Sequence, residues 1–214
     1  MLKSVCFIVL SSVFISTASA QVAKLGNPTL SGSGCPQGSV SVALTEDAST
    51  ISVLFSSFTA TYAHASSPRT NFLTLNCRIK IPIQVPPGYA MDLMKLEYRG
   101  FYAVPNRFST FILETKALTV SKYITSPPQI TKVAGPVATN YQIVHNLSRP
   151  LRSVCGREFE LDFTINMGVQ GRLGKGWVNP LEGDAMISLD SLDAGGSDDG
   201  AGAYLGVALK PCTK

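Results

Sequence analysis

Apolar and polar residues alternate strictly in two long segments of this chain. In residues 77–85, a cysteine, three isoleucines and a valine occupy every second position, separated by basic residues, proline and glutamine. Residues 159–167 repeat the pattern, with acidic and polar residues between large apolar ones. Alternate side chains of a strand lie on opposite faces, so each segment predicts a strand with one face in a core and the other in water. Pro82 cannot donate a ladder hydrogen bond, which predicts an edge position or a bulge there.

Weaker forms of the same pattern recur along the chain. They predict further strands at residues 39–44, 51–55, 89–104, 107–120, 141–147, 185–189 and 205–209. Residues 126–136, rich in proline and threonine, predict an irregular crossover, and the glycine-rich residues 168–176 predict a hairpin loop. No segment carries a convincing helical stripe. The expected fold is all-β, a two-sheet antiparallel β-sandwich of jelly-roll-like type with about ten strands.

The first twenty residues have the pattern of a signal peptide. Lys3 precedes an apolar stretch at residues 5–15, and Ala18-Ser19-Ala20 provides a small-x-small cleavage site. We therefore expect residues 1–20 to be removed and residues 21–214 to form a single β-sandwich domain in a secreted, periplasmic or extracellular location. The apolar stretch is short for a membrane span, and no other long apolar run predicts a transmembrane segment in the mature chain.

Charge and composition exclude one class of partner. The chain has 18 basic and 14 acidic residues, so loss of Lys3 leaves a net charge of +3. No block of consecutive basic residues occurs, whereas nucleic-acid binding usually requires a basic stripe. We expect no nucleic-acid partner.

Four cysteines remain after removal of Cys6 with the signal peptide. An even number in an exported chain predicts disulfides, with three possible connectivities for Cys35, Cys77, Cys155 and Cys212. The favoured pairing is Cys35–Cys77 and Cys155–Cys212, which keeps each bond within one half of the chain. Zinc binding would require close cysteine pairs with histidine nearby, and every cysteine here is isolated.

Several short motifs, in order, resemble one family. They are G-S-G-C-P-Q-G-S-V-S-V at residues 32–42, Asn76-Cys77-Arg78, Pro86-Pro87-Gly88, Tyr98-Arg99-Gly100-Phe101, Gly135-Pro136, Cys155-Gly156 and the ending from Asp199-Gly200 to Cys212. Together they are similar to the secreted-protein family called domain of unknown function 4360. The resemblance implies export, a single β-rich domain and these disulfide positions, and it brings no established activity.

Three acidic residues are the candidates for catalysis. Glu158, Glu160 and Asp162 alternate along one predicted strand face. Paired carboxylates can hydrolyse glycosidic bonds, although such a row is more often the solvated side of the strand, or faces Arg78 and Lys80 across the sheet. A serine nucleophile elbow, G-x-S-x-G, is absent from the sequence.

An acidic, glycine-rich segment near the end of the chain is a candidate calcium loop. It contains Asp190, Asp193, Asp198 and Asp199, and carboxylate oxygens are the ligands that calcium prefers. The spacing does not match an EF-hand, and a solvated loop explains the composition equally well. No other cofactor is expected.

Aromatic residues offer a possible sugar-binding surface. Trp177, Tyr98, Phe101 and Tyr102, with Arg99, could contact a glycan, or the rings could belong to the core. Asn146-Leu147-Ser148 fits the N-x-S glycosylation pattern.

The sequence thus favours an exported, non-enzymatic β-sandwich with a binding or structural role at or outside the cell surface. Its site is expected on loops at one end, with an extracellular glycan or cell-surface component as partner. The alternative is a polysaccharide-acting hydrolase that uses the carboxylates.

Overall fold

The computed structural model describes residues 23–46, 49–64, 72–121, 124–171, 173–174, 177–178, 181, 183–195 and 208–212. These residues form sixteen strands and no α-helix. The predicted signal peptide lies outside them.

Two antiparallel sheets of seven strands each make up the molecule, with a separate two-stranded pair. Sheet A contains β1 (Lys24–Leu25), β2 (Thr29–Ser31), β6 (Phe72–Gln84), β8 (Ser109–Ser121), β9 (Ile124–Thr125), β10 (Gln129–Ala134) and β12 (Phe159–Gly171). Sheet B contains β3 (Val40–Leu44), β4 (Thr50–Phe55), β5 (Thr59–Tyr62), β7 (Tyr89–Val104), β11 (Val137–Arg152), β15 (Ala185–Gly195) and β16 (Ala208–Pro211). The separate pair is β13 (Leu173–Gly174) and β14 (Trp177–Val178).

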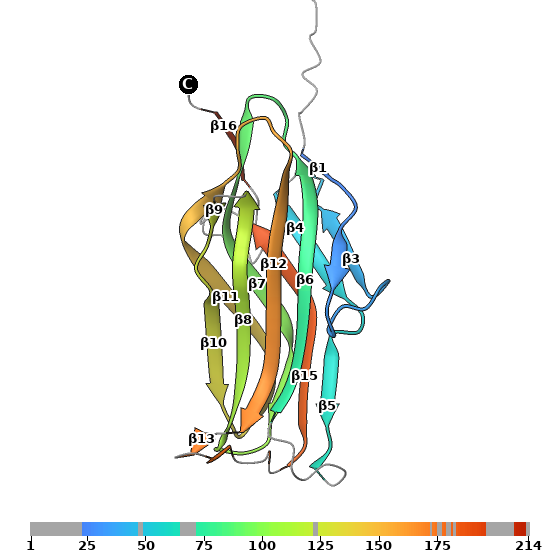
Figure 1. Ribbon diagram of the computed structural model, residues 1–214, viewed down its shortest axis with the longest axis vertical. Coiled ribbons are helices and arrows are strands. Elements are labelled where there is room, and N and C mark those ends of the chain that lie inside the picture. Colours follow the sequence, from blue (N-terminus) through green and yellow to red (C-terminus); the bar gives the residue numbers. More distant parts are fainter. Residues whose placement is uncertain are drawn as a thin grey trace, which may run out of the picture.

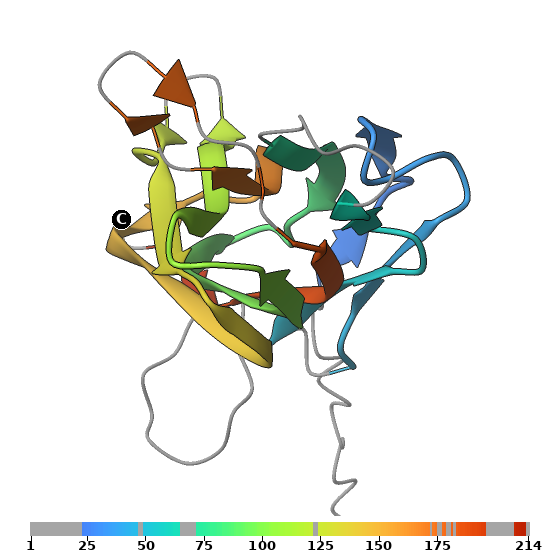
Figure 2. The ribbon, with the colours of Figure 1, turned by 90° about the horizontal axis from the view of Figure 1, so that it is seen from below.

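The two sheets lie face to face as a sandwich. In Figure 1 the long strands β6, β12 and β8 of sheet A run side by side in front of β7 and β15 of sheet B, and Figure 2 views the molecule along the strands. The spatial order is β1-β6-β12-β8-β10 in sheet A and β11-β7-β15-β4-β3 in sheet B. The chain crosses between sheets from β6 to β7 to β8, and again from β11 to β12. This confirms the predicted two-sheet antiparallel sandwich of jelly-roll-like type.

The core forms where the two inner faces meet. The apolar residues of the two alternating segments, including Ile79, Ile81, Phe163 and Ile165, are buried there. From sheet B they meet Leu96 and other buried residues of the same cluster. The alternation in the sequence therefore identified the inner face of each long strand correctly.

A buried polar network also joins the sheets. Tyr98 of β7 and Thr115 of β8 share a hydrogen bond. On β11, His145 lies 3.4 Å from the Thr115 hydroxyl through Nδ1 and 2.8 Å from the Thr131 hydroxyl of β10 through Nε2. Burial lowers the pKa of His145 and raises that of Tyr98. The neutral imidazole thus bridges two threonines of the opposite sheet.

Both disulfides have the favoured pairing. Cys35 and Cys77 are 5.4 Å apart between Cα atoms, and their bond joins the segment before β3 of sheet B to β6 of sheet A. Cys155 and Cys212 are 6.0 Å apart and join the β11–β12 connection to the residue after β16. Each bond therefore ties together segments that are distant in the sequence.

Several predicted boundaries were wrong. Residues 129–134 form β10 where an irregular crossover was expected, and residues 168–171 belong to β12 instead of a hairpin loop. The number of strands also exceeds the expected ten because short strands such as β1, β2 and β5 were missed. Pro82 lies in an internal strand, at the gap between β1 and β2, where its carbonyl accepts a 2.7 Å hydrogen bond from the Gly26 N–H. A missing N–H is tolerated at such a gap.

Removal of the first disulfide tests its contribution to stability. Replacing Cys35 and Cys77 together by alanine frees a loop with a sequence separation of 42 residues. Loss of this cross-link should lower the free energy of unfolding by about 4 kcal/mol, because the unfolded chain gains conformational entropy. Urea denaturation measures the change, with the Cys155→Ala/Cys212→Ala variant as the comparison. An unchanged midpoint would contradict the expectation.

The buried histidine predicts sensitivity to acid. The pKa of His145 is lowered in the folded chain, so the unfolded state binds the proton first, at its pKa of about 6.5. The free energy of unfolding should therefore fall as pH drops from about 6.5 through the lower folded-state value. His145→Gln, whose amide can still bond Thr131, should lose less stability over this interval. Urea denaturation near pH 7.5 and near pH 5 measures the difference, and equal losses in both proteins would refute it.

Candidate functional site

The outer face of sheet A carries cross-strand rows of side chains centred on β12. Gln170 lies opposite Phe72 of β6, and Asn166 lies between Asn76 of β6 and Glu114 of β8. Neighbouring strands are about 4.8 Å apart, so side chains of one row contact one another. This face is turned toward the viewer in Figure 1.

Gly168 forms the floor of a groove on this face. Its partners are Thr74 on β6 and Ile112 on β8, so the central strand has no side chain in this row. A Cβ atom at Gly168 would lie 2.5 Å from the Leu73 carbonyl oxygen. That approach is too close for any other residue, which explains a glycine inside a long strand. The groove has a volume of about 430 Å³.

The two walls of the groove combine apolar and polar side chains. One wall is Phe72, Thr74 and Asn76 of β6, and the other is Ile112, Glu114 and Lys116 of β8. Phe72 is 58% exposed although it is a large apolar residue. An exposed ring at the edge of a groove is typical of a binding surface.

Some polar groups in the groove are bonded and others are open to a ligand. The Asn166 amide donates a 2.9 Å hydrogen bond to Glu114, and the Lys116 ammonium lies 3.6 Å from the same carboxylate. Within the described residues, the side chains of Thr74 and Gln170 make no hydrogen bond to protein. The groove thus presents a fixed carboxylate and free hydrogen-bonding groups beside an apolar ring.

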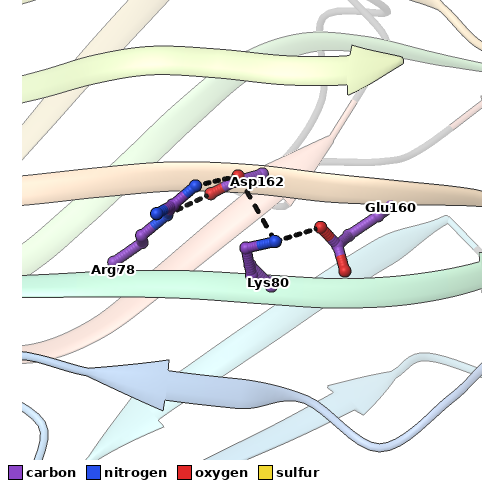
Figure 3. Close-up of polar contacts among 4 residues, drawn as sticks. All are labelled: Arg78, Lys80, Glu160 and Asp162. Atoms are coloured by element: carbon purple, nitrogen blue, oxygen red, sulfur yellow. Dashed lines mark hydrogen bonds and ion pairs between the residues drawn. The ribbon is translucent and has the colours of Figure 1, made fainter. Parts of the chain in front are cut away.

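Two of the three predicted catalytic carboxylates, Glu160 and Asp162, lie farther along β12 and are held in ion pairs. Figure 3 shows Arg78 and Lys80 of β6 reaching across to Asp162 and Glu160. Arg78 bonds Asp162 through Nε at 3.0 Å and Nη2 at 2.7 Å, and Lys80 lies 2.6 Å from Glu160 and 3.8 Å from Asp162. These ion pairs between neighbouring strands of sheet A are the ones that the sequence offered as the alternative to catalysis.

This pairing opposes acid catalysis by Asp162. The hydrogen bond from Arg78 lowers the pKa of Asp162, whereas a general acid in a glycosidase requires a raised pKa. Glu158 precedes β12 and is exposed. The catalytic role of the three carboxylates stays a prediction, and the ion pair of Asp162 opposes it for that residue.

The acidic segment is partly strand instead of loop. Asp190 and Asp193 belong to β15, and Asp193 accepts a 2.5 Å hydrogen bond from the Ser52 hydroxyl of β4. Asp198 and Asp199 lie outside the described residues. Within the described part of the chain, no group of three or more potential metal-binding side chains gathers. Residues 191–195 pair with neighbouring strands, and the calcium loop stays a prediction.

Most of the aromatic candidates also lie elsewhere. Tyr98 and Tyr102 are buried in the core, and Tyr102 stacks on Phe111 with the ring centroids 4.5 Å apart. Both rings therefore contribute to the core, the alternative that the sequence offered for them. Phe101 is only partly buried. Trp177 lies in β14, and its side chain is not among the parts that the structure describes.

Arg99 is placed on the outer face of sheet B. It pairs with the buried carboxylate of Glu97, with Nε 2.9 Å and Nη2 2.5 Å from Oε1. Gln142 donates a further 2.6 Å hydrogen bond to the same oxygen. Arg99 therefore lies on the opposite side of the sandwich from the groove.

The groove residues were missed by the sequence interpretation. Phe72, Thr74 and Gly168 continue the alternation of two predicted strands beyond their expected ends. That continuation was the available signal, but the glycines were interpreted as a loop. The expected site on end loops is thus replaced by a candidate site on a sheet face.

None of the described residues forms a helix long and apolar enough to cross a membrane.

Comparison with solved structures gives only weak similarities. TmCBM61 in complex with β-1,4-galactotriose is 14% identical with a TM-score of 0.27, over 78% of this chain and 86% of that one. The family 11 carbohydrate-binding module from Clostridium thermocellum, in complex with a β-1,3-1,4-mixed-linked tetrasaccharide, is 11% identical with a TM-score of 0.27, over 82% and 88%. TM-scores this low support no inference about this chain.

Comparison of sequences is more informative. An uncharacterized secreted protein of Arthroderma benhamiae is 29% identical over 73 residues, which are 34% of this chain and 29% of that relative. The match thus spans less than a third of the relative's length. This secreted relative and the two disulfides fit an extracellular location. The family model of a domain of unknown function, DUF4360, matches residues 21–197, and the chain belongs to this family.

Proposed function

We propose that this chain is an exported carbohydrate-binding protein that holds a glycan in the groove on the outer face of sheet A. The observation that carries the proposal is the exposed ring of Phe72 beside hydrogen-bonding side chains, over a floor without a side chain at Gly168. A sugar ring has an apolar C–H face and a rim of hydroxyl groups. A binding site for it therefore needs both an apolar surface and well-placed polar groups.

The dimensions of the groove suit a short stretch of a glycan chain. Phe72 and Asn76 are four residues apart on one wall, which corresponds to about 13 Å along a strand. The volume of about 430 Å³ lies within the range of small-molecule sites. A ligand in this groove would lie lengthwise along β12, between β6 and β8.

The polar groups are arranged to bind hydroxyls. Glu114 is held by Asn166 at 2.9 Å, so its carboxylate is oriented before a ligand arrives. The hydroxyl of Thr74 and the amides of Asn76 and Gln170 are available from the other wall and the end of the floor. Such preorganised partners reduce the entropy lost on binding.

The ion pair between Arg78 and Asp162 favours a binding protein over a hydrolase. The hydrogen bonds from Arg78 favour the ionised state of Asp162 and lower its pKa. A carboxylate that stays ionised can accept hydrogen bonds and attract positive charge, but it is a poor proton donor.

Truncation of the exposed ring tests the proposal. Phe72→Ala should weaken binding about tenfold, because ring contact with a sugar contributes about 1–1.5 kcal/mol. Affinity electrophoresis against laminarin, barley β-glucan, galactan, xyloglucan, polygalacturonate and alginate identifies a ligand, and calorimetry measures the affinity. Far-ultraviolet circular dichroism confirms folding of each variant.

Leu54→Ala is the matched control. Leu54 is 53% exposed, comparable to Phe72, but lies on β4 of sheet B. The control should bind as the unaltered protein does. The proposal fails if no glycan in the panel binds, or if Phe72→Ala binds as tightly as Leu54→Ala.

A further inference from the structure

Exposed basic side chains border the groove. The side chain of Lys116 is 55% exposed and that of Arg78 is 53% exposed. Lys132 of β10 is also exposed, and it lies opposite Ile112, whose side chain forms part of the groove wall. Directly opposite residues share a face of the sheet, so Lys132 lies on the same outer face.

Arg78 and Lys116 flank one position of β12. Thr164 lies opposite Arg78 on one side and opposite Lys116 on the other. The Cα atoms of the two basic residues are therefore about 10 Å apart, across two strand spacings. The residue between them is small and carries a hydroxyl. Two long basic side chains at this separation can both reach a group bound above Thr164.

The acidic partners of these cations are more covered than the cations themselves. The side chain of Asp162 is 22% exposed and that of Glu114 is 23% exposed. Beside Thr164 the basic side chains are therefore more exposed than their acidic partners, whereas Glu160, farther along β12, is 46% exposed. An approaching anion meets the basic groups before it meets the carboxylates.

Both cations retain capacity for a further bond. Arg78 uses Nε and Nη2 for Asp162, and its Nη1 has no partner among the residues that the structure describes. The Lys116 ammonium is 3.6 Å from Glu114, longer than a hydrogen bond. Such an exposed pair contributes little to stability, so Lys116 can turn to a ligand at small cost.

We propose that the glycan is acidic, and that a carboxylate of a uronic acid residue binds between Arg78 and Lys116 above Thr164. This inference rests on the proposed function of the groove. The ligand then extends along β12 from Thr164 to Gln170, six residues and about 20 Å, and a sugar unit farther along the glycan lies against Phe72. Arginine binds carboxylates through its planar fork, lysine adds a second charge, and the Thr164 hydroxyl donates a hydrogen bond.

Matched glycans that differ only in charge test the inference. Polygalacturonate and its fully methyl-esterified form share one sugar chain, and alginate and its propylene glycol ester provide a second pair. The unaltered protein should bind the acidic member of a pair about tenfold more tightly than the ester. The preference should shrink as sodium chloride is added, because salt screens exposed charges.

Lys116→Gln identifies the side chain responsible. It should weaken binding of the acidic glycan about fivefold and leave the ester unaffected. Lys210→Gln is the control, because it removes the same charge from an exposed lysine of β16 in sheet B. Calorimetry with each glycan measures the affinities.

The outcomes separate this inference from the function on which it rests. Equal binding of acid and ester, both weakened by Phe72→Ala, overturns the acidic ligand and retains glycan binding. An acidic preference that Lys116→Gln leaves unchanged, or that Lys210→Gln weakens equally, overturns the site between Arg78 and Lys116. Failure of every glycan to bind overturns both proposals.

Discussion

Strands β6 and β12 pair over twelve consecutive residues, from Phe159 opposite Ile83 to Gln170 opposite Phe72. Side chains alternate between the two faces, so a slip of one residue would expose the isoleucines and bury the charges. The inner face packs the core, and the same register aligns Arg78 with Thr164 and Thr74 with Gly168 on the outer face. Core and candidate site therefore depend on one pairing.

Interactions at several points hold this pairing in place. The ion pairs of Arg78 and Lys80 with Asp162 and Glu160 link the two strands on the solvent side. Cys77 of β6 is bonded covalently to Cys35, and the network around His145 connects sheet A to sheet B from within the core. A face supported in this way presents its side chains from a rigid surface, as binding sites on strands require.

The sequence predicted the elements whose alternation is complete. Residue types and spacing predicted the inner faces of β6 and β12. They also favoured the observed disulfide pairing and offered the ion pairs between β6 and β12. Strand β10 was missed because Thr131 occupies an inward position, where it bonds His145 instead of contributing to apolar burial. Tyr98 and Tyr102 were considered for sugar stacking because of their residue type alone. The charged residues at positions 95, 97 and 99 alternate with the apolar ones, and this pattern places both tyrosines on the inner face, where they are buried. The groove was missed because glycine usually marks a turn, whereas Gly168 lies against a neighbouring backbone.

That close approach has a consequence for which parts of the groove can vary. The depth of the groove is set by backbone atoms, the Leu73 carbonyl and Gly168, and no side-chain substitution can deepen it. The walls, in contrast, are side chains on the solvent face that take no part in the core. Residues at positions 72, 112 and 116 can thus be exchanged without disturbing the packing between the sheets. The sandwich combines a groove floor that is set by backbone atoms with walls that are free to differ in shape and charge.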